Sequence, residues 1–580
     1  MSGGGAATVL VVGAGINGAA LARELTLSGC DVVVVDDHDL AAGTTAWSTR
    51  LVHGGLRYLE YGELALVRES LAERERLVRV APHLVRPLPF YLPVRGRFGG
   101  VASAAARVVG LERLAARCRG TRGRGSVAAG LGLTLYDLLS TGRRWPRHRR
   151  VRPGTPGLPA VDREGFPRAL VYVDAQLLHP ERFTVELLVD AAAIAAERGR
   201  SLVVHTRARV RIDDQGRAIV EPAVGAPTHH RVDAVVNVTG AWVDEALAGG
   251  LRALRPADRR LIGGTKGSHL LLDHPALRMA LAEHGVYAEA ADGRPVFVLP
   301  FGPRLVLVGT TDLPWRGDPW TARTEPDEID YLLAAVARLF PQLCPGPGDV
   351  VQWYCGVRPL PAGGAAAPAG ITRRHMLVRH PAAPVPAWSV VGGKLTTCRS
   401  LAESSTRTIL ATLGRPVTGS SRDRRLPGAV ESAARPALVA ETARAAAALG
   451  VAADACHEAA EATVNLFGSR APEWLAGAPV AGPPLLAGTA LPAAVVRACV
   501  RQEWGRTLSD LVERRLMLVF TEPLRRTTLM GIAAVLEAEG LLPRGEAAAE
   551  VDAVVADLAA RYGKRVVDDR SGDDCTRKEL

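Results

Sequence analysis

Three glycines near the N-terminus stand at a spacing that could bind a dinucleotide. Gly13, Gly15 and Gly18 follow an apolar run and open a helical stretch, and a second apolar run ends in Asp36. In such a turn the first glycine permits the tight bend, the second lets the backbone approach a pyrophosphate, and the third lets the helix pack closely on the sheet. The helix N-terminus presents free N–H groups to the phosphates, and the acid binds a ribose hydroxyl. The spacing predicts a dinucleotide site, with Asp37 as a one-residue alternative to Asp36.

These residues need a β-α-β unit to position them, and residues 7–90 have the pattern of one. A chain of 580 residues is too long for one hydrophobic core, so we expect two or three domains. Residues 414–428 have the composition of a linker, and the chain beyond them is Ala-rich and helical. The predicted boundaries are 1–415 for the first part, with a basic insertion at about 95–155, then 425–565 for a helical domain and 566–580 for a polar tail.

The composition favours a globular protein in a reducing compartment. Hydrophobic residues make up 48% of the chain, and no stretch is long and apolar enough to span a bilayer. The eight cysteines are scattered without a C-x-x-C pair, which argues against a disulfide framework or a zinc site, so we expect no metal. The first apolar run lacks a preceding basic segment, so we expect no signal peptide and a cytoplasmic location.

The positive charge of the chain is concentrated in one segment. The net charge is +11, but residues 95–152 alone hold fourteen arginines and two acids, so the remainder is close to neutral. Apolar residues recur at helical spacing between 101 and 115, as in an amphipathic helix. The segment could dock on an anionic membrane surface or could be a solvated insertion. Nucleic acid is not expected as a partner, because the segment has only three aromatic residues on which bases could stack.

Further motifs follow the glycine turn in order along the chain. They occupy residues 39–46, 51–60, 172–175, 236–242, 265–269, 309–312, 356–360, 371–373 and 392–397, and, beyond the linker, 503–507 with Asp510, Arg514 and Arg515. Together they resemble the FAD-dependent glycerol-3-phosphate dehydrogenases over nearly the whole chain, except for the basic segment. The resemblance implies FAD as the cofactor. It also implies an α/β fold class: a Rossmann-like FAD-binding domain interleaved with a mostly antiparallel β substrate domain, followed by an all-α C-terminal domain.

The resemblance implies that contacts with FAD come from distant parts of the chain. The turn at Thr239 and Gly240 is small enough to let a flat cofactor approach. The helix that begins near Leu395 directs its positive end at the flavin edge that gathers negative charge on reduction. Thr44 and Thr45 could cap a helix, reach the pyrophosphate, or do both. The cofactor-binding candidates are Gly13, Gly15, Gly18, Asp36, Thr44, Thr45, Arg50, His53, Gly54, Gly55, Val210, Thr239, Gly240, Gly392, Gly393, Lys394, Leu395 and Thr396.

The implied substrate, sn-glycerol 3-phosphate, carries about two negative charges near neutral pH, so its site needs cations. The implied reaction oxidises the C2 alcohol to dihydroxyacetone phosphate and transfers a hydride to flavin N5. His53 is the preferred catalytic base, because imidazole titrates near the neutral range, and His269 is a second possibility. The candidates for substrate binding are Arg57, Lys266, His269, Thr311, Arg358, Arg373 and Lys394.

Three positions depart from the pattern of the resembled family. Asp36 replaces the usual Glu at the end of the second strand, and Arg50 replaces a Lys that often precedes the His-Gly-Gly motif. Arg374 stands where an Asp usually follows the motif arginine, which changes the surroundings of Arg373.

The resemblance implies a membrane quinone as the electron acceptor. It therefore implies peripheral contact with the cytoplasmic face of a membrane, for which residues 95–152 are the candidate, and it is compatible with a homodimer. An oxidase that passes electrons to O₂ and forms H₂O₂ has the same motifs and stays open as an alternative. The number of basic motif residues disfavours a flavin enzyme with a carboxylate substrate. The scarcity of aromatic residues disfavours a non-catalytic flavoprotein that binds nucleic acid.

Overall fold

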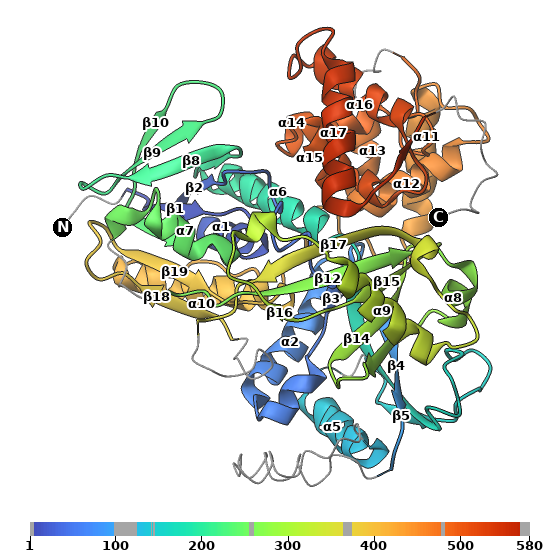
Figure 1. The fold of residues 1–580 in the computed structure, drawn as a ribbon. Helices are drawn as coiled ribbons and strands as arrows, with labels where there is room; N and C mark the ends of the chain where they lie inside the picture. The colour runs from blue at the N-terminus through green and yellow to red at the C-terminus, as the bar shows by residue number, and fades with distance from the viewer. Residues whose placement is uncertain are drawn as a thin grey trace.

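The computed structural model describes residues 5–97, 125–140, 142, 145–254, 260–362, 374–476 and 482–568. In this part of the chain two sheets lie side by side, and a helical C-terminal domain packs against them (Figure 1). The predicted amphipathic stretch at 101–115 and the candidate Arg373 lie outside the described residues.

The first sheet is a parallel sheet with one antiparallel edge strand. Its strand order is β18-β19-β11-β1-β2-β7, and only the β18–β19 pair is antiparallel. The valine runs of the sequence form its centre, because strands covered on both faces favour β-branched apolar residues. The strands are β1 (Thr8–Val12), β2 (Asp31–Val35), β7 (Leu202–His205), β11 (Ala234–Asn237), β18 (Met376–Arg379) and β19 (Ala387–Val391).

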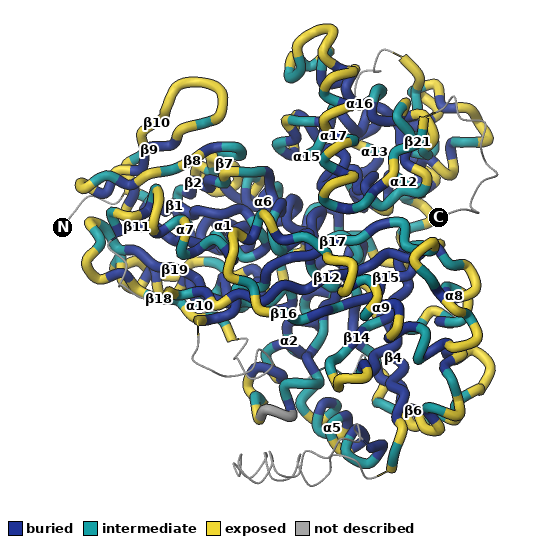
Figure 2. The backbone as a smooth tube through the Cα atoms, in the orientation of Figure 1, coloured by how far each residue is buried: buried dark blue, intermediate teal, exposed yellow. Residues whose placement is uncertain are grey.

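Both faces of this sheet are covered. Helices α1 (Ile16–Leu27), α6 (Pro180–Arg198) and α10 (Cys398–Thr412) form a core with one face. A three-stranded antiparallel sheet of β8 (Ala208–Ile212), β9 (Arg217–Pro222) and β10 (Thr228–Arg231), together with α7 (Val243–Ala248), covers the other. Figure 2 shows the central strands as buried and the β9–β10 connection as exposed.

The second sheet is almost entirely antiparallel. Its main order is β16-β12-β15-β14-β13-β4-β6-β3, with β17 paired to β12 and β5 paired to β6, and only β13 and β4 run parallel. Helices α8 (Pro275–Ala280) and α9 (Pro326–Leu339) cover one face, and α2 (Leu64–Val80) and α5 (Ser126–Leu139) pack near β4 and β6. The strands are β3 (Leu51–Val52), β4 (Val85–Val94), β5 (Arg149–Val151), β6 (Arg168–Leu177), β12 (Thr265–Leu272), β13 (Gly285–Glu289), β14 (Pro295–Phe301), β15 (Leu305–Gly309), β16 (Leu313–Pro314) and β17 (Val350–Arg358).

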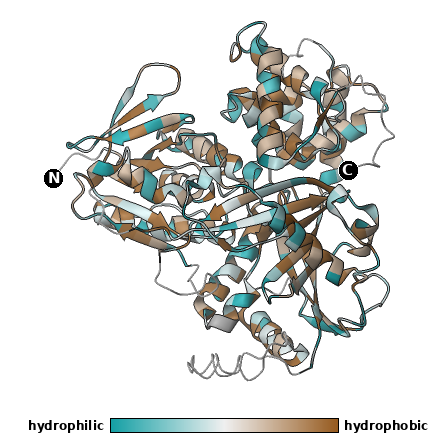
Figure 3. Ribbon diagram, in the orientation of Figure 1, coloured by the Kyte–Doolittle hydropathy of each residue, from teal (hydrophilic) through white to brown (hydrophobic). Residues whose placement is uncertain are grey.

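The chain passes between the two sheets several times, which confirms the predicted interleaved α/β class. Strands of the first sheet come from residues near 10, 35, 205, 237 and 390, and the second sheet uses the segments between them. Apolar residues fill both sheets and the helices packed on them (Figure 3).

In its described residues, 429–476 and 482–568, the C-terminal domain is helical except for one short strand pair. Its longer helices are α11 (Arg435–Ala448), α12 (Cys456–Phe467), α14 (Ala494–Gln502), α16 (Arg526–Ala538) and α17 (Ala547–Tyr562). The first residues of the predicted polar tail form β21 (Val566–Val567), which pairs in parallel with β20 (Leu524–Arg525), and the tail beyond residue 568 lies outside the described residues. The buried ammonium of Lys564, which donates to the carbonyl of Thr521 at 2.6 Å, holds this segment in place.

The predicted linker packs along the first domain. Leu426 and Ser421 are buried, and Arg424 pairs with Asp190 of α6 at 3.1 Å. Apolar and ionic contacts thus attach residues of this stretch to the helices beside the first sheet.

Candidate active site

The glycine turn between β1 and α1 is closed by contacts that exclude any side chain. Gly13 has a φ of +106°, and a Cβ atom there would lie 2.7 Å from the carbonyl oxygen of Val238. A Cβ atom at Gly18 would lie 1.9 Å from the carbonyl oxygen of Gly13, so α1 packs directly on the turn. Gly15 precedes α1 and has no side chain to cover its first turn. This shape lets a pyrophosphate approach a helix N-terminus.

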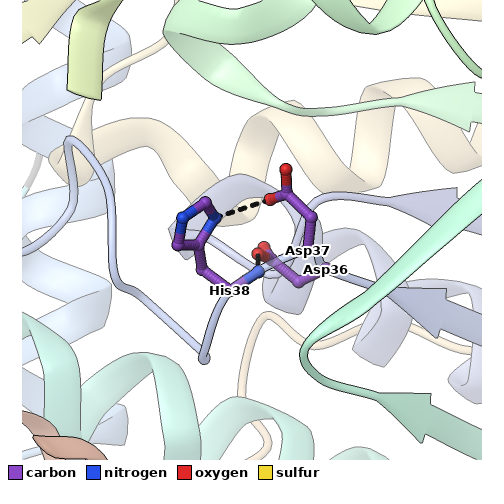
Figure 4. A group of neighbouring side chains, drawn as sticks. All are labelled: Asp36, Asp37 and His38. Carbon is purple, nitrogen blue, oxygen red and sulfur yellow. Dashed lines mark hydrogen bonds and ion pairs between the residues drawn. The ribbon is translucent and has the colours of Figure 1, made fainter. Parts of the chain in front are cut away.

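Asp36 faces the glycine turn, whereas Asp37 points outward and pairs with His38 at 2.8 Å (Figure 4). The carboxylate of Asp36 accepts the N–H of Ala14 at 2.6 Å and the N–H of His38 at 2.9 Å. Burial raises the pKa of Asp36 to about 6, although these two N–H donors act in the opposite direction. Each carboxylate oxygen keeps a lone pair for a further donor such as a ribose hydroxyl.

The two threonines of the 39–46 motif hold the loop beside α1. The hydroxyl oxygen of Thr45 accepts the N–H of Ile16 at 3.0 Å, so Thr45 caps the helix that the glycine turn opens. Thr44 donates to the carbonyl of Val357 at 2.8 Å and thereby attaches the loop to β17. The loop therefore joins the nucleotide end of the site to the second sheet.

Three further candidates lie on or just after strands: Thr239 and Gly240 follow β11, and Val210 is in the middle of β8. The hydroxyl of Thr239 donates to the side chain of Asn237 at 2.7 Å, and Gly240 has a φ of +63°. Val210 lies on β8, whose first residue donates its N–H to the carbonyl of Asp36 at 2.9 Å. These positions surround the nucleotide end, away from the cavity described below.

The turn after β19 contains Gly392 and Gly393 and lies beside α1. With the turns at Gly13 and Gly240 it makes three glycine-containing turns, which we call the glycine corners. A Cβ atom at Gly393 would lie 2.7 Å from the side-chain nitrogen of Asn17, so the two segments touch. The short helical turn η7 (Leu395–Thr397) follows and leads into α10. The hydroxyl of Thr396 lies 3.2 Å from the backbone nitrogen of His53, which donates to it. Segments distant in sequence thus converge as a bound dinucleotide would require.

A cavity of about 280 Å³ opens between the two sheets. Residues that sequence reasoning missed also line it, and among them Thr310 and Asp312 belong to a recognised motif, whereas Arg294 belongs to none. The predicted residues that line it are Thr44, Arg50, His53, Gly55, Arg57, His269, Arg358, Gly392, Gly393, Lys394, Leu395 and Thr396.

A buried hydrogen-bond network holds the His-Gly-Gly backbone. The N–H of Gly54 donates to the hydroxyl of Tyr136 at 2.9 Å, and that hydroxyl donates to Asp174 at 2.7 Å. Arg74 completes the network by pairing with Asp174 at 2.6 Å. Burial and the neighbouring carboxylate raise the pKa of Tyr136 well above its ordinary value, so it stays a proton donor. Tyr136 comes from the end of the basic insertion, where the sequence offered no signal for this role.

Arg358 lies across the cavity wall on β17. Its guanidinium contacts Asp312 at 3.0 Å and the hydroxyl of Thr310 at 2.9 Å. A Cβ atom at Gly267 would lie 2.1 Å from that guanidinium, so glycine leaves the space that the arginine occupies. The arginine is therefore oriented by neighbours while it faces the cavity.

Further cations border the same cavity. The ammonium of Lys394 lies 3.7 Å from the ring centre of Tyr58 and 3.4 Å from the hydroxyl of Ser70. Arg57 and Arg294 also line the cavity. Together with Arg358, these side chains give the cavity a cationic wall suited to an anionic ligand.

Two of the predicted substrate residues do not reach the cavity. Lys266 is 4% exposed and pairs with Glu328 at 2.7 Å, and Thr311 donates to the same carboxylate at 2.6 Å. Successive residues of a strand point to opposite faces, so Gly267 and His269 of β12 face the cavity and Lys266 faces away. The geometry does not support the prediction that Lys266 and Thr311 contact the substrate.

Arg50 turns its side chain into a buried ion pair. Its guanidinium binds both oxygens of Glu181, at 2.6 and 2.9 Å, and lies 4.6 Å from the ring centre of Phe520 in the C-terminal domain. Its φ of +58° places it in the left-handed backbone region, which residues other than glycine rarely adopt. Arg50 lines the cavity, yet its charge is already matched by Glu181, so a direct cofactor contact is not supported.

His269 is a buried imidazole in the cavity wall. Its Nε2 lies 2.9 Å from the hydroxyl of Thr49, its ring stacks on Tyr354 at 4.9 Å, and its Nδ1 is buried without a hydrogen-bond partner among the described residues. Burial and the charges of Arg358 and Arg50 lower the pKa of His269 well below its ordinary value. His269 is therefore neutral at neutral pH.

The parallel sheet, the glycine turns and the cavity between the sheets define a dinucleotide-binding protein of the Rossmann-like class. Residues 8–379 match the family described as FAD dependent oxidoreductase. A solved glycerol-3-phosphate dehydrogenase from Bacillus halodurans, complexed with FAD, has the same fold, with a TM-score of 0.66, 22% identity and coverage of 96% of this chain and 95% of that one.

Curated relatives narrow the class. A glycerol-3-phosphate dehydrogenase of Synechocystis is 35% identical over 68% of each chain, and the aerobic enzyme of Escherichia coli is 33% identical over 68% of this chain and 72% of its own. A D-erythritol 1-phosphate dehydrogenase of Brucella abortus is 31% identical over 87% of this chain and 93% of its own. This chain belongs to the FAD-dependent oxidoreductases and, within them, to the glycerol-3-phosphate dehydrogenase family.

Proposed function

We propose that this protein oxidises sn-glycerol 3-phosphate to dihydroxyacetone phosphate with FAD as its cofactor. The observation that carries the proposal is the position of Arg57, Arg358 and Lys394 around the same cavity as His53. Cations match a phosphate dianion, and a histidine beside them matches an alcohol that must lose a proton. Two relatives named for this substrate, at 35% and 33% identity, support the same choice.

The cofactor-binding role of the glycine corners follows from their shape. The close approaches at Gly13 and Gly393 leave backbone where side chains would otherwise intrude, and Asp36 keeps lone pairs for ribose hydroxyls. The N-terminus of α1 would face the pyrophosphate, with Thr45 at its edge, and the N-terminal side of α10 would face the isoalloxazine. When bound, FAD supplies the hydride acceptor of the reaction.

The chain's own residues hold the phosphate and move the proton. Asp312 and Thr310 orient Arg358 at the cavity wall, so a bound phosphate would share its guanidinium with these partners, and Lys394 adds a compact charge. His53 accepts the proton of the C2 hydroxyl as the hydride leaves that carbon. The backbone N–H groups of His53 and Gly54 donate to the hydroxyls of Thr396 and Tyr136, and these hydrogen bonds hold the backbone that carries this imidazole beside the cavity.

His269 is the alternative base, and the observation in its favour is its buried Nδ1, which has no hydrogen-bond partner in the described parts of the chain. A matched pair of variants, His53→Ala and His269→Ala, separates the two roles. The base variant slows flavin reduction at saturating substrate, whereas a contact variant mainly raises the substrate dissociation constant. A larger rate loss in His269→Ala than in His53→Ala would transfer the assignment to His269.

Anaerobic reduction of the bound flavin tests the substrate. Glycerol 3-phosphate should bleach the visible absorption of the flavin, while glycerol and glycerol 1-phosphate should leave it. Bleaching by all three compounds would contradict a pocket that grips the phosphate. D-erythritol 1-phosphate belongs in the same comparison, because the relative named for it matches over 87% of this chain. Faster reduction by the erythritol ester would make the longer polyol the substrate.

We also infer that the electrons pass to a membrane quinone. Oxygen uptake with stoichiometric H₂O₂ under air, at a rate equal to that with a soluble quinone, would instead favour an oxidase. Among the described residues no helix combines the length and apolar character needed to cross a membrane, so contact would be peripheral.

Helix α5 supports such contact through its outer face. Leu131 and Leu138 are 62% and 75% exposed and stand seven residues apart, on one side of the helix. Arg149 and Arg150 of β5 add positive charge in the same part of the fold. Replacing both leucines by Glu should abolish flotation with anionic vesicles, whereas Met279→Glu, at an equally exposed position on α8, should not. Equal flotation of all three proteins would end this proposal.

A further inference from the structure

Asp39 is a buried carboxylate at the start of the loop that carries the cofactor candidates Thr44 and Thr45. It is 1% exposed and accepts hydrogen bonds from two arginines of the C-terminal domain. Arg514 contacts it at 2.6 Å, and Arg515 contacts its two oxygens at 2.8 and 2.7 Å. A carboxylate in this setting is held in one orientation, because both of its oxygens are bound by planar donors.

The two arginines are themselves held in place. Arg515 donates to the carbonyl of Glu503 at 2.8 Å, and Arg514 contacts Asp510 at 3.2 Å. The carboxylate of Asp510 also accepts the N–H groups of Arg506 and Thr507, at 3.0 and 3.1 Å. These contacts position both guanidinium groups before they meet Asp39.

The same C-terminal segment reaches the other side of the nucleotide turn. Arg207 pairs with Asp510 and donates to the hydroxyl of Thr507 at 2.9 Å. The backbone N–H of Arg207 donates to the carbonyl of His38 at 2.8 Å. The segment that follows Asp36 is therefore attached to one C-terminal motif at two points, at His38 through Arg207 and directly at Asp39.

We propose that the C-terminal domain positions the FAD-binding loop, with Asp39, Arg514 and Arg515 as positioning residues for the cofactor. Asp39 follows Asp36 by three residues, and the N–H of Ala41 donates to the carbonyl of Ala14 in the glycine turn at 3.1 Å. A displaced Asp39 would move the ribose and pyrophosphate candidates together. The inference rests on the cofactor assignment proposed above.

A second buried ion pair provides the control for a purely structural role. Arg182 of α6 binds Glu503 of the C-terminal domain, with Nη2 at 2.8 Å, and both residues are fully buried. This pair also joins the C-terminal domain to the first domain, but it lies on a helix and not on the nucleotide loop. Arg515 contacts only the backbone carbonyl of Glu503 in hydrogen bonding, and a change of the Glu503 side chain to an amide leaves that carbonyl in place. A carboxyl-to-amide change at either site removes one buried charge from the same interface.

The test compares Asp39→Asn with Glu503→Gln in the full-length protein stripped of FAD. FAD affinity is measured by quenching of flavin fluorescence, and the melting temperature of the apo protein reports stability. Both variants should melt at lower temperature than the unchanged protein. Only Asp39→Asn should raise the dissociation constant for FAD by about tenfold or more, within the range usual for coupling between sites.

The outcomes separate this inference from the proposed cofactor. Failure of the unchanged apo protein to bind FAD would overturn the cofactor assignment itself. Binding by the unchanged protein, with equal FAD affinities in both variants, would overturn the positioning role. If Asp39→Asn does not fold, Arg514→Lys decides, because it keeps the charge and loses the planar contact. Unchanged FAD affinity in Arg514→Lys would then refute the inference.

Discussion

A comparison of variants at two basic residues gives the sharpest test of the site. Lys266 and Arg358 both stand in motifs, yet Lys266 faces Glu328 behind β12 and Arg358 faces the cavity. We therefore expect Lys266→Met to affect folding stability and Arg358→Gln to affect substrate binding. The sequence alone predicts the same effect for both.

The expected loss of stability in Lys266→Met follows from the carboxylate of Glu328, which would lose its cationic partner. Glu328 is 4% exposed, and breaking a buried ion pair costs about 3–5 kcal/mol in the free energy of unfolding. The hydroxyls of Ser268 and Thr311 still donate to Glu328, so we expect the lower end, about 3 kcal/mol. Burial alone would raise the pKa of Glu328, but the hydrogen bonds from Lys266 and Thr311 outweigh it and lower that pKa.

The sign of the pH dependence follows from this shift. A carboxyl group whose pKa is lowered by folding adds stability above its unfolded pKa and loses it as the pH falls. The stability gap between the unchanged protein and Lys266→Met should therefore narrow as the pH falls into the acid range where Glu328 becomes protonated. A gap that widens on acidification would contradict the ion pair.

The expected loss of substrate affinity in Arg358→Gln follows from the charge that Arg358 places at the cavity wall. Loss of charge-assisted hydrogen bonds to a phosphate costs about 3 kcal/mol, which is about 100-fold in the dissociation constant. Anaerobic flavin reduction at varied glycerol 3-phosphate gives this constant, and chemical denaturation gives the stability of both variants. Weak binding in Lys266→Met with unchanged stability would refute the placement of the two side chains.

Three further predictions test other parts of the site. His53→Ala should lower the limiting rate of flavin reduction by about 100-fold with little change in substrate affinity, as stopped-flow traces would show. FAD affinity should fall about tenfold from pH 7 to pH 5, because Asp36, with a pKa of about 6, then loses its charge; Asp36→Asn should remove this dependence. Gly18→Ala should abolish FAD retention and lower the melting temperature, since its Cβ would lie 1.9 Å from the carbonyl oxygen of Gly13, and full retention would contradict that packing.

The parts of the fold that repeat a local pattern could be predicted from the sequence. The valine runs, the glycine turn and the acid at position 36 form β1, α1 and β2 in the expected order. The direction in which a motif residue points could not be read in the same way. Lys266 and His269 are three residues apart in one strand and so lie on opposite faces, but only the packing of β12 in the folded sheet shows which of the two faces the cavity.

The sequence also could not predict polar contacts between residues that lie far apart along the chain. Glu181 forms an ion pair with Arg50 although more than a hundred residues separate them, and no local sequence pattern near either residue indicates the pair. Likewise, the charge of the basic insertion predicts only a surface role, whereas the structure shows that the hydroxyl of Tyr136 from this insertion contacts the site. Long-range polar contacts of this kind depend on packing that is settled only in the folded chain.

Helix α5 connects the proposed membrane contact to the site. Leu131 and Leu138 are exposed on its outer side, while Tyr136, 2% exposed, holds the backbone of Gly54 on its inner side. Deleting the whole insertion would therefore disturb the cavity as well as any membrane contact, and a loss of activity after deletion would have two causes. Substitutions confined to the outer leucines leave the hydrogen bond to Gly54 in place. They separate membrane attachment from catalysis, because each function depends on a different face of the same helix.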